Sequence, residues 1–254
     1  MKTVSPIKAK PLRQAGQSLR DTLDDLVFDK LQTLMLITTL LWLLAFVEWV
    51  RKLQGADPAA ELYTFIAAGF SVYAFARGYD YFKQARNIKL GLDGEQAVGE
   101  YLNRLVAKGY RVYHDIPCTK GNIDHVIICS RGVFTIETKT RSKPEKGDAV
   151  ATFDGESITF NGYRNDDAPI RQARAQSAYL KTLLKEETGH DYPVKPVVVI
   201  PGWFVESLPG SHQSSVWVLN PKAVHKWIDN EAESITDEYV KLAATKLGKF
   251  VRNC

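Results

Sequence analysis

Uncharged apolar residues fill a long stretch near the N-terminus of the chain. Leu31 to Val47 contains no charged residue, and the stretch is closed by Glu48, Arg51 and Lys52. A helix of this length spans the hydrocarbon core of a bilayer. About thirty residues precede it and no small-residue cleavage pattern follows, which argues against a signal peptide. We therefore expect a retained membrane span over about residues 31–50.

A second apolar stretch, Leu62 to Ala76, is shorter and less hydrophobic than the first. Tyrosines at 63, 73, 79 and 81 are distributed as interfacial aromatic residues are. The turn-forming sequence Gln54 to Pro58 separates the two stretches. We expect a transmembrane hairpin over residues 31–82, with the second span at about 60–78. The alternative is a buried or amphipathic helix packed on a soluble domain.

The basic residues indicate a topology. They precede the first span at Lys2, Lys8, Lys10, Arg13, Arg20 and Lys30, and they follow the second at Arg77, Lys83, Arg86 and Lys89. The positive-inside bias then places both flanks in the cytoplasm of a bacterial-type inner membrane, including a basic segment at residues 1–30. With a single span, the same bias would export the C-terminal domain. Three widely spaced cysteines without a CxxC pair favour a reducing compartment.

Beyond Gly91 the pattern changes to alternating helices and strands, which predicts a soluble α/β domain over residues 91–254. A helix is expected over Asp93 to Leu105, with Gly109 as its stop. Three strands should form an antiparallel meander, and short strands and helices should follow a loop rich in Lys, Pro and Gly. The strands are expected at Tyr110–His114, Ile123–Cys129, Val133–Thr138, Ile158–Phe160, Pro196–Ile200 and Val216–Leu219, and the later helices at Ala168–Glu187, Pro221–Ile228 and Asp237–Val251.

Charged residues that point to chemistry lie at the end of the central hairpin. Strand alternation places Glu137 and Lys139 on one face, and the short Ser-Arg-Gly turn brings Asp124 of the preceding strand near them. Two converging carboxylates suit Mg²⁺ or Mn²⁺, which can activate a water for attack on a phosphodiester. The lysine can orient that water or stabilise the charge that develops on phosphorus. The alternative is a solvated cross-strand pair and an aspartate that only forms a turn.

Three segments carry a family resemblance: GLDGEQAVGEYL, YHDIPCTKGNIDHVIICSRGVFTIETKT and APIRQARAQSAYLKTLL. Together they resemble the nuclease-related domain, NERD, of the PD-(D/E)xK restriction-endonuclease-like superfamily, over roughly Gly91 to Leu184 within a motif-bearing core at 91–200. The resemblance implies a restriction-endonuclease-like core, with a central mixed sheet flanked by helices, preceded here by one or two transmembrane helices. It also implies action on nucleic acid with a divalent metal.

The resemblance also implies roles for individual residues. Glu95 matches the glutamate of the family's first helix, Asp124 the motif aspartate, and Glu137 and Lys139 the (D/E)xK pair. Gln172 matches a glutamine of the helix that follows the sheet. Metal binding is thereby expected at Asp124, Glu137 and Glu95. The usual proline before the aspartate is Ile123 here, as is common in this family.

The net charge of +4 is compatible with a polyanionic partner but is also common in proteins that bind none. Phosphate contacts are expected from basic residues after the central strand and on the following helix. These residues are Arg141, Lys143, Arg171 and Arg174. Trp203 and Phe204 are aromatic candidates for base stacking, although burial is the commoner fate of such residues. His125 alternates to the face opposite Asp124, and we expect a structural or substrate-proximal role for it.

The leading hypothesis is thus a membrane-anchored, metal-dependent nuclease that acts on nucleic acid, DNA rather than RNA. The first alternative is a non-catalytic, membrane-tethered nucleic-acid-binding module on the same fold. A third possibility is an assembly protein in which the hairpin and the closing helix mediate homo-oligomerisation.

Overall fold

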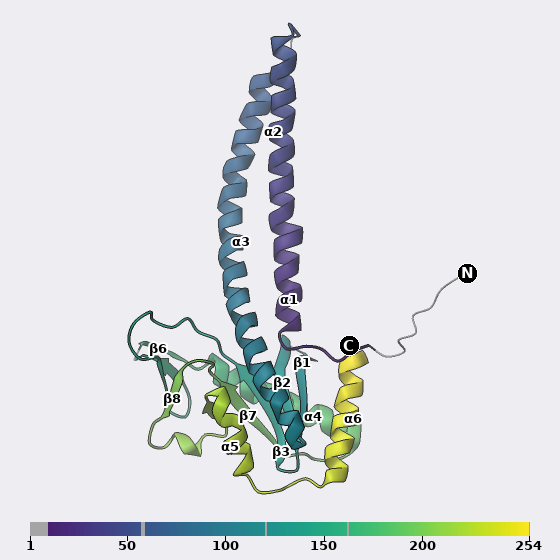
Figure 1. Ribbon diagram of the computed structural model, residues 1–254, viewed down its shortest axis with the longest axis vertical. Helices are drawn as coiled ribbons and strands as arrows, with labels where there is room; N and C mark the ends of the chain where they lie inside the picture. The colour runs from purple at the N-terminus through teal and green to yellow at the C-terminus, as the bar shows by residue number, and fades with distance from the viewer. Residues whose placement is uncertain (1–9, 57–58, 120, 162, 254) are drawn as a thin grey trace, which may run out of the picture. The chain divides into compact units, whose positions relative to one another are not determined.

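The computed structural model describes residues 10–56, 59–119, 121–161 and 163–253 (Figure 1). Residues 19–89 form one compact unit, and residues 10–18 form a second unit together with 90–253. The first nine residues of the expected basic segment, Asp57 and Pro58 of the expected turn, and Cys254 lie outside the described residues. Cys118 and Cys129 are free thiols.

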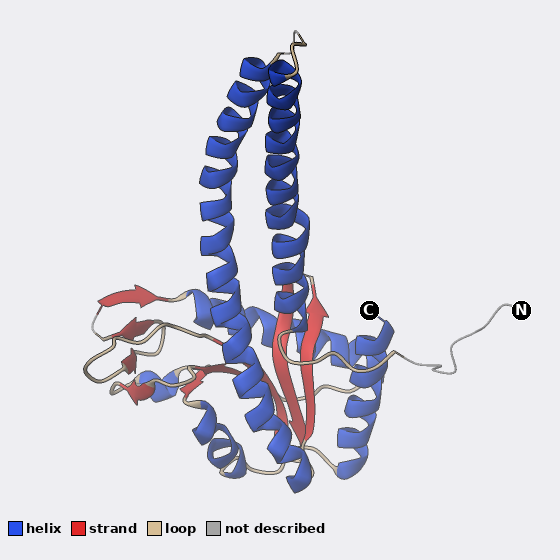
Figure 2. Cartoon of the chain, turned by 45° about the horizontal axis from the view of Figure 1, so that its top comes forward, coloured by secondary structure: helices blue, strands red, loops and turns tan. Residues whose placement is uncertain are grey.

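The unit of residues 19–89 is a pair of helices. After α1 (Gln17–Asp24) and the π-helix η1 (Asp25–Leu31), α2 (Gln32–Leu53) runs beside the first part of α3 (Ala60–Asn103) (Figure 2). Two indole N–H groups of α2 join the helices, from Trp42 to Ser71 Oγ and from Trp49 to Thr64 Oγ1, both at 2.9 Å. These bonds hold α2 and α3 together as a hairpin.

Among the described residues, one helical segment is long and apolar enough to cross a membrane. It runs from Gln17 to Leu53 and reaches a mean hydropathy of 1.9. The apolar stretch of α3, Leu62 to Ala76, does not reach the hydropathy of such a segment, because tyrosines, serines and glycines lie between its apolar residues. The second predicted span therefore stays a prediction.

Helix α3 is longer than the sequence pattern indicates. The prediction that a separate helix starts at Asp93 is wrong, because α3 runs from Ala60 through this position without a break. No proline interrupts this stretch, and single glycines cost a helix only about 1 kcal/mol each. The C-terminal stop is confirmed: the 3₁₀-helix η2 (Arg104–Lys108) ends at Gly109, whose φ is +90°.

The main sheet has five strands in the order β1-β2-β3-β7-β9. Strands β1 (Arg111–Cys118), β2 (Gly121–Cys129) and β3 (Gly132–Thr138) form the predicted antiparallel meander. Strands β7 (Val194–Val199) and β9 (Trp217–Leu219) continue the sheet in parallel. The predicted mixed sheet is therefore confirmed.

Helices cover both faces of this sheet because its strands are apolar on both sides. Helices α4 (Ala168–Thr188) and α6 (Asp237–Asn253) pack on one face, around Leu180 and Leu247. The end of α3 and α5 (Val224–Asp229), which follows the 3₁₀-helix η4 (Pro221–Ala223), pack on the other. The predicted flanking helices are confirmed.

A second sheet of four strands was not predicted. Its order is β6-β5-β4-β8, with bounds Tyr163–Asp166, Ile158–Phe160, Val150–Phe153 and Phe204–Ser207. Only Ile158–Phe160 was expected as a strand, and β4 lies in the segment predicted to be a loop. Strand β4 is four residues long and is stabilised by pairing with the distant β8, which local periodicity does not indicate.

Candidate active site

Asp124 and Glu137 lie opposite one another at one end of the central hairpin. His125 pairs with Ile136 in the antiparallel register, so the next step of the ladder brings Asp124 opposite Glu137. Opposite residues project from the same face of a sheet. Both carboxylates are buried. The predicted convergence of the two acids follows from this register.

Each carboxylate is held by one of its oxygens. The backbone N–H of Thr138 donates to Oδ2 of Asp124 at 2.7 Å. Oε2 of Glu137 accepts from Nε2 of Gln172 at 2.9 Å and from Nε2 of Gln176 at 2.7 Å. The second oxygen of each carboxylate has no hydrogen-bond partner among the described residues. One oxygen of each acid is therefore available to a ligand.

Gln176 was missed by the sequence reasoning, whereas Gln172 was proposed. Both lie on α4, four residues apart, so they share one helix face and reach the same carboxylate. Gln176 is the more buried of the two and also donates to the carbonyl of Asn122 at 3.1 Å. The i, i+4 repeat of glutamine in QARAQ is the signal that could have revealed it.

Glu95 reaches the same region from α3. Its side chain is buried, and Oε2 has no hydrogen-bond partner among the described residues. Burial raises the pKa of Glu95 to about 8, and the nearby charges of Asp124 and Asp115 add to the shift. A buried oxygen without a hydrogen-bond partner is a place where a water, an ion or another ligand is expected to bind.

The acids at the hairpin end also perturb one another. Burial raises the pKa of Asp124 well above its usual value, and the neighbouring Glu137 raises it further. Burial raises the pKa of Glu137 to about 7, although its bond from Gln176 and the charge of Lys139 oppose this rise. Negative charge at this position is therefore costly unless a cation compensates it.

Lys139 is the first residue beyond β3. Its backbone N–H donates to the carbonyl of Val199 at 2.9 Å, which fixes it beside β7. Its charge lowers the pKa of both Asp124 and Glu137, so the ammonium acts on both carboxylates. Within the described part of the chain it forms no ion pair.

Asp115 is a further acid that the sequence reasoning did not find. It is fully buried on β1, has a φ of +51°, and lies opposite Asp124 in the β1-β2 register. Its carboxylate accepts bonds from Nε of Arg13 and Nδ2 of Asn122, both at 2.5 Å, and from Oγ of Ser18 at 3.0 Å. An aspartate inside the apolar strand VYHDI was the available signal.

A glycine fixes the distance between α3 and the end of β3. A Cβ at Gly94 would lie 1.7 Å from Oγ1 of Thr140, closer than any side chain allows. Only glycine lets the helix pass here, one residue before Glu95. The close approach thus sets how far Glu95 reaches toward the hairpin end.

The carboxylates at the hairpin end supply some, but not all, of the ligands that a divalent cation needs. No group of three or more His, Cys, Asp or Glu side chains within the described ranges is arranged as a ready metal cage. Mg²⁺, however, is usually bound by one or two carboxylates, several waters and the substrate's phosphates. Asp124 and Glu137, each with one free oxygen, are two carboxylates of this kind.

Most of the basic residues predicted to contact phosphate form ion pairs with acidic residues of this chain. Arg141 pairs with Asp166 and Arg171 pairs with Asp167. Arg174 forms two bonds of 3.0 Å to Glu156. Lys143 is the one of the four that forms no ion pair among the described residues.

The other candidates separate into buried and exposed residues. His125 is fully buried, and its Nδ1 lies 2.8 Å from Nδ1 of His114. Burial lowers the pKa of His114 to about 4 and that of His125 well below its usual value. Trp203 is 4% exposed and belongs to the core, whereas Phe204 is 69% exposed.

Residues 90–201 match the family described as NERD, nuclease-related domain. The match includes Glu95, Asp124, Glu137, Lys139 and Gln172, and it indicates a nuclease-related function. Among curated proteins, none matches this chain.

One solved structure with some likeness is that of Pyrococcus furiosus SfsA in complex with Ca²⁺. It is 14% identical, with a TM-score of 0.26, over 50% of this chain and 55% of that chain. The chain thus spans about half the length of the structure it matches.

Proposed function

We propose that residues 90–253 hydrolyse phosphodiester bonds of nucleic acid, DNA rather than RNA, with Mg²⁺ or Mn²⁺. The observation that carries the proposal is the pairing of two buried carboxylates, Asp124 and Glu137, with Lys139 acting on both. The match to the nuclease-related domain supports the same reaction class.

The residues divide the work in the following way. Asp124 and Glu137, fixed through one oxygen each, would hold the cation through their second oxygens, and Oε2 of Glu95 on α3 would be a further ligand. When bound, the cation polarises the phosphate and lowers the pKa of a water. Lys139 orients the attacking water and stabilises the charge of the transition state. Gln172 and Gln176 keep Glu137 in position.

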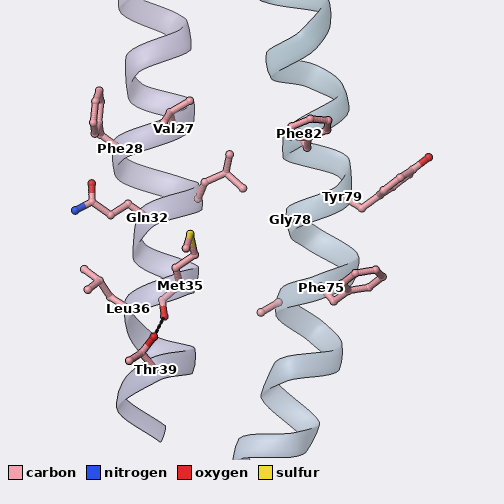
Figure 3. A pocket seen from close by; sticks show the side chains of 12 residues that line it. Val27, Phe28, Gln32, Met35, Leu36, Thr39, Phe75, Gly78, Tyr79 and Phe82 are labelled. Atoms are coloured by element: carbon pink, nitrogen blue, oxygen red, sulfur yellow. Dashed lines mark hydrogen bonds between the residues drawn. The ribbon is translucent and has the colours of Figure 1, made fainter. Parts of the chain in front are cut away.

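We further propose that residues 19–89 anchor the protein in a membrane, with the nuclease domain in the cytoplasm. Large apolar side chains of α2 and α3 are exposed, among them Met35, Phe65 and Phe75. A groove of about 800 Å³ between the two helices is lined mostly by apolar side chains, including Phe28 and Phe82 (Figure 3). Such surfaces are stable against lipid tails and costly in water.

The test is cleavage by the full-length protein in lipid nanodiscs, with defined DNA and RNA substrates and with Mg²⁺, Mn²⁺ or EDTA. Glu137→Ala and Lys139→Ala should each lower the rate by at least about a hundredfold. Glu206→Gln, a change at an exposed acid of β8, is the matched control and should cleave normally. Unchanged cleavage in Lys139→Ala or Asp124→Ala would refute the mechanism.

A second candidate is a membrane-tethered module that binds nucleic acid without cutting it. The lack of a ready cage of three metal ligands among the described residues favours this reading. It predicts salt-sensitive binding that persists in EDTA and no cleavage of any substrate in the same panel.

A further inference from the structure

A pocket of about 510 Å³ lies in the unit that contains the candidate active site. Its lining includes Val98 of α3, three residues beyond Glu95, and Lys143, four residues beyond Lys139. Its lining also includes residues that follow β7 and β9, among them Phe204 and Lys222. Two elements that carry candidate catalytic residues thus also contribute to the lining of this pocket.

The lysines of this pocket differ from the arginines near α4. Lys143 and Lys222 form no ion pair within the described ranges, whereas Arg171 and Arg174 are paired with acids of the chain. The side chain of Lys143 lies along Gly202: a Cβ there would be 2.9 Å from Cε and 3.2 Å from Nζ of the lysine. Its charge is thus placed at the pocket and available to a phosphate.

The pocket wall is held in place by hydrogen bonds. The hydroxyl of Tyr101 donates to the carbonyl of Lys222 at 3.2 Å, which ties α3 to η4. Nδ2 of Asn220 donates to the carbonyl of Trp203 at 2.9 Å, which ties the segment after β9 to the segment after β7. These bonds fix the backbone on which Lys222 and Phe204 are carried, so less order has to be created on binding.

Phe204 is an exposed ring on a fixed backbone. It is 69% exposed, and its N–H donates to the carbonyl of Ala149 at 2.8 Å at the start of β8. The preceding Trp203 is buried and packs edge-on against Phe160, with 5.0 Å between ring centroids. An exposed aromatic ring beside unpaired lysines is the arrangement that proteins use to bind unpaired nucleic acid strands.

We propose that this pocket binds an unpaired segment of the substrate strand. One base stacks on Phe204, and the adjoining phosphates contact Lys143 and Lys222. The pocket volume lies in the range of small-ligand sites and accommodates one nucleotide. The inference rests on the proposed nuclease function and adds to it a preference for substrates with single-stranded character next to the cleaved bond.

The experiment measures binding of the full-length protein in nanodiscs to a labelled single strand and to a blunt duplex, in EDTA so that no strand is cut. Phe204→Ala should weaken single-strand binding about tenfold and leave duplex binding nearly unchanged. The double variant Lys143→Gln/Lys222→Gln should lower the slope of log affinity against log salt by about 1.4 for the single strand. Lys185→Gln, at an exposed lysine of α4 that is paired with Asp191, is the matched control and should bind as wild type.

Several results would overturn the inference. These are unchanged binding in the Phe204 and double-lysine variants, an equal loss in Lys185→Gln, or an equal loss for single strand and duplex in Phe204→Ala. The altered side chains are exposed or line the pocket, and equal unfolding temperatures would show that the fold is kept.

A parallel cleavage assay in Mg²⁺ separates this inference from the proposed function. Normal cleavage by wild type with no change in KM in the pocket variants overturns the inference alone. Strand binding that depends on the pocket, without cleavage by wild type, overturns the nuclease function and supports the pocket. A wild-type protein that neither binds nor cuts nucleic acid overturns both.

Discussion

Gln176 of α4 donates a 2.7 Å hydrogen bond to Oε2 of Glu137, and the same amide nitrogen reaches the carbonyl of Asn122 at 3.1 Å. One buried amide therefore connects the end of β3 with the start of β2, the two strands that carry the candidate metal ligands. Among the described residues, the side chain of Gln172 bonds only the carboxylate of Glu137. Substitution of Gln176 is therefore expected to destabilise the fold more than substitution of Gln172.

Gln176→Leu should destabilise the fold by about 1–3 kcal/mol, because it leaves a buried carbonyl and a buried carboxylate short of a donor. It should also weaken divalent-cation binding, because Glu137 is no longer held in position. Calorimetric unfolding and cation titration measure the two effects. Gln172→Leu is the control, with a smaller loss of stability. An equal loss in both variants would contradict the role given to Gln176.

Gly94→Ala should destabilise the protein and lower nuclease activity, because the new Cβ meets Thr140 and pushes α3 and Glu95 away from the hairpin end. Overpacking of this kind typically costs about 1–3 kcal/mol. Gly69→Ala is a matched control on the same helix, because a Cβ at this position would enter open space. It should be neutral or stabilising by up to about 1 kcal/mol. A harmless Gly94→Ala would show that the close approach is not needed.

The metal-free protein should lose stability as the pH rises from about 7 to about 9. The pKa of Glu95 is raised from 4.5 in the unfolded chain to about 8 in the folded protein. The stability that this group contributes is therefore complete at a pH below 4.5 and is lost as the pH rises through about 8. Asp124 and Asp115 add to this rise of the pKa, and Glu95 in turn raises the pKa of Glu137. The expected loss is about 1 kcal/mol for this group.

Glu95→Gln tests the origin of that pH dependence. In EDTA the variant should lose less stability than wild type between pH 7 and pH 9, and the dependence that remains comes from Asp124 and Glu137, whose pKa values are also raised. Mg²⁺ should reduce the loss in wild type at pH 9 by compensating the negative charge. Thermal unfolding followed by circular dichroism is the measurement. An identical pH dependence in wild type and variant would rule out Glu95 as its source.

Arg13→Ala should destabilise the protein by about 1–3 kcal/mol, because Asp115 is fully buried and loses its charged donor. Bonds from Ser18 and Asn122 remain and limit the loss. Arg20→Ala, at an exposed arginine, is the control and should have little effect. Chemical unfolding followed by fluorescence compares them, and equal midpoints for the two variants would contradict the ion-pair account.

Local pattern was sufficient for the central hairpin. Period-two alternation and a tight turn determine the register of β2 and β3, and this register brings Asp124 opposite Glu137. The (D/E)xK spacing then places Lys139 just past the strand end. Most of the strands and flanking helices follow from the same kind of periodicity.

Contacts between distant segments were not accessible in this way. Asp115 looks like an ordinary strand residue until Arg13, 102 positions earlier, is found beside it. Gln176 contacts a carboxylate 39 positions away, and β4 depends on pairing with β8. The continuity of α3 was missed because an apolar segment and an amphipathic one were read as separate helices.

The ion pair between Arg13 and Asp115 has a topological consequence. Arg13 and Ser18 precede the helical unit of residues 19–89, yet they bind a strand of the domain that follows it. The chain therefore enters the helical unit from the same folded domain to which it returns afterwards. A folded domain lies on one side of a bilayer. If the segment ending at Leu53 crosses a membrane, the chain must return across it before Leu90. An even number of crossings follows from this rule without reference to the hydropathy of α3.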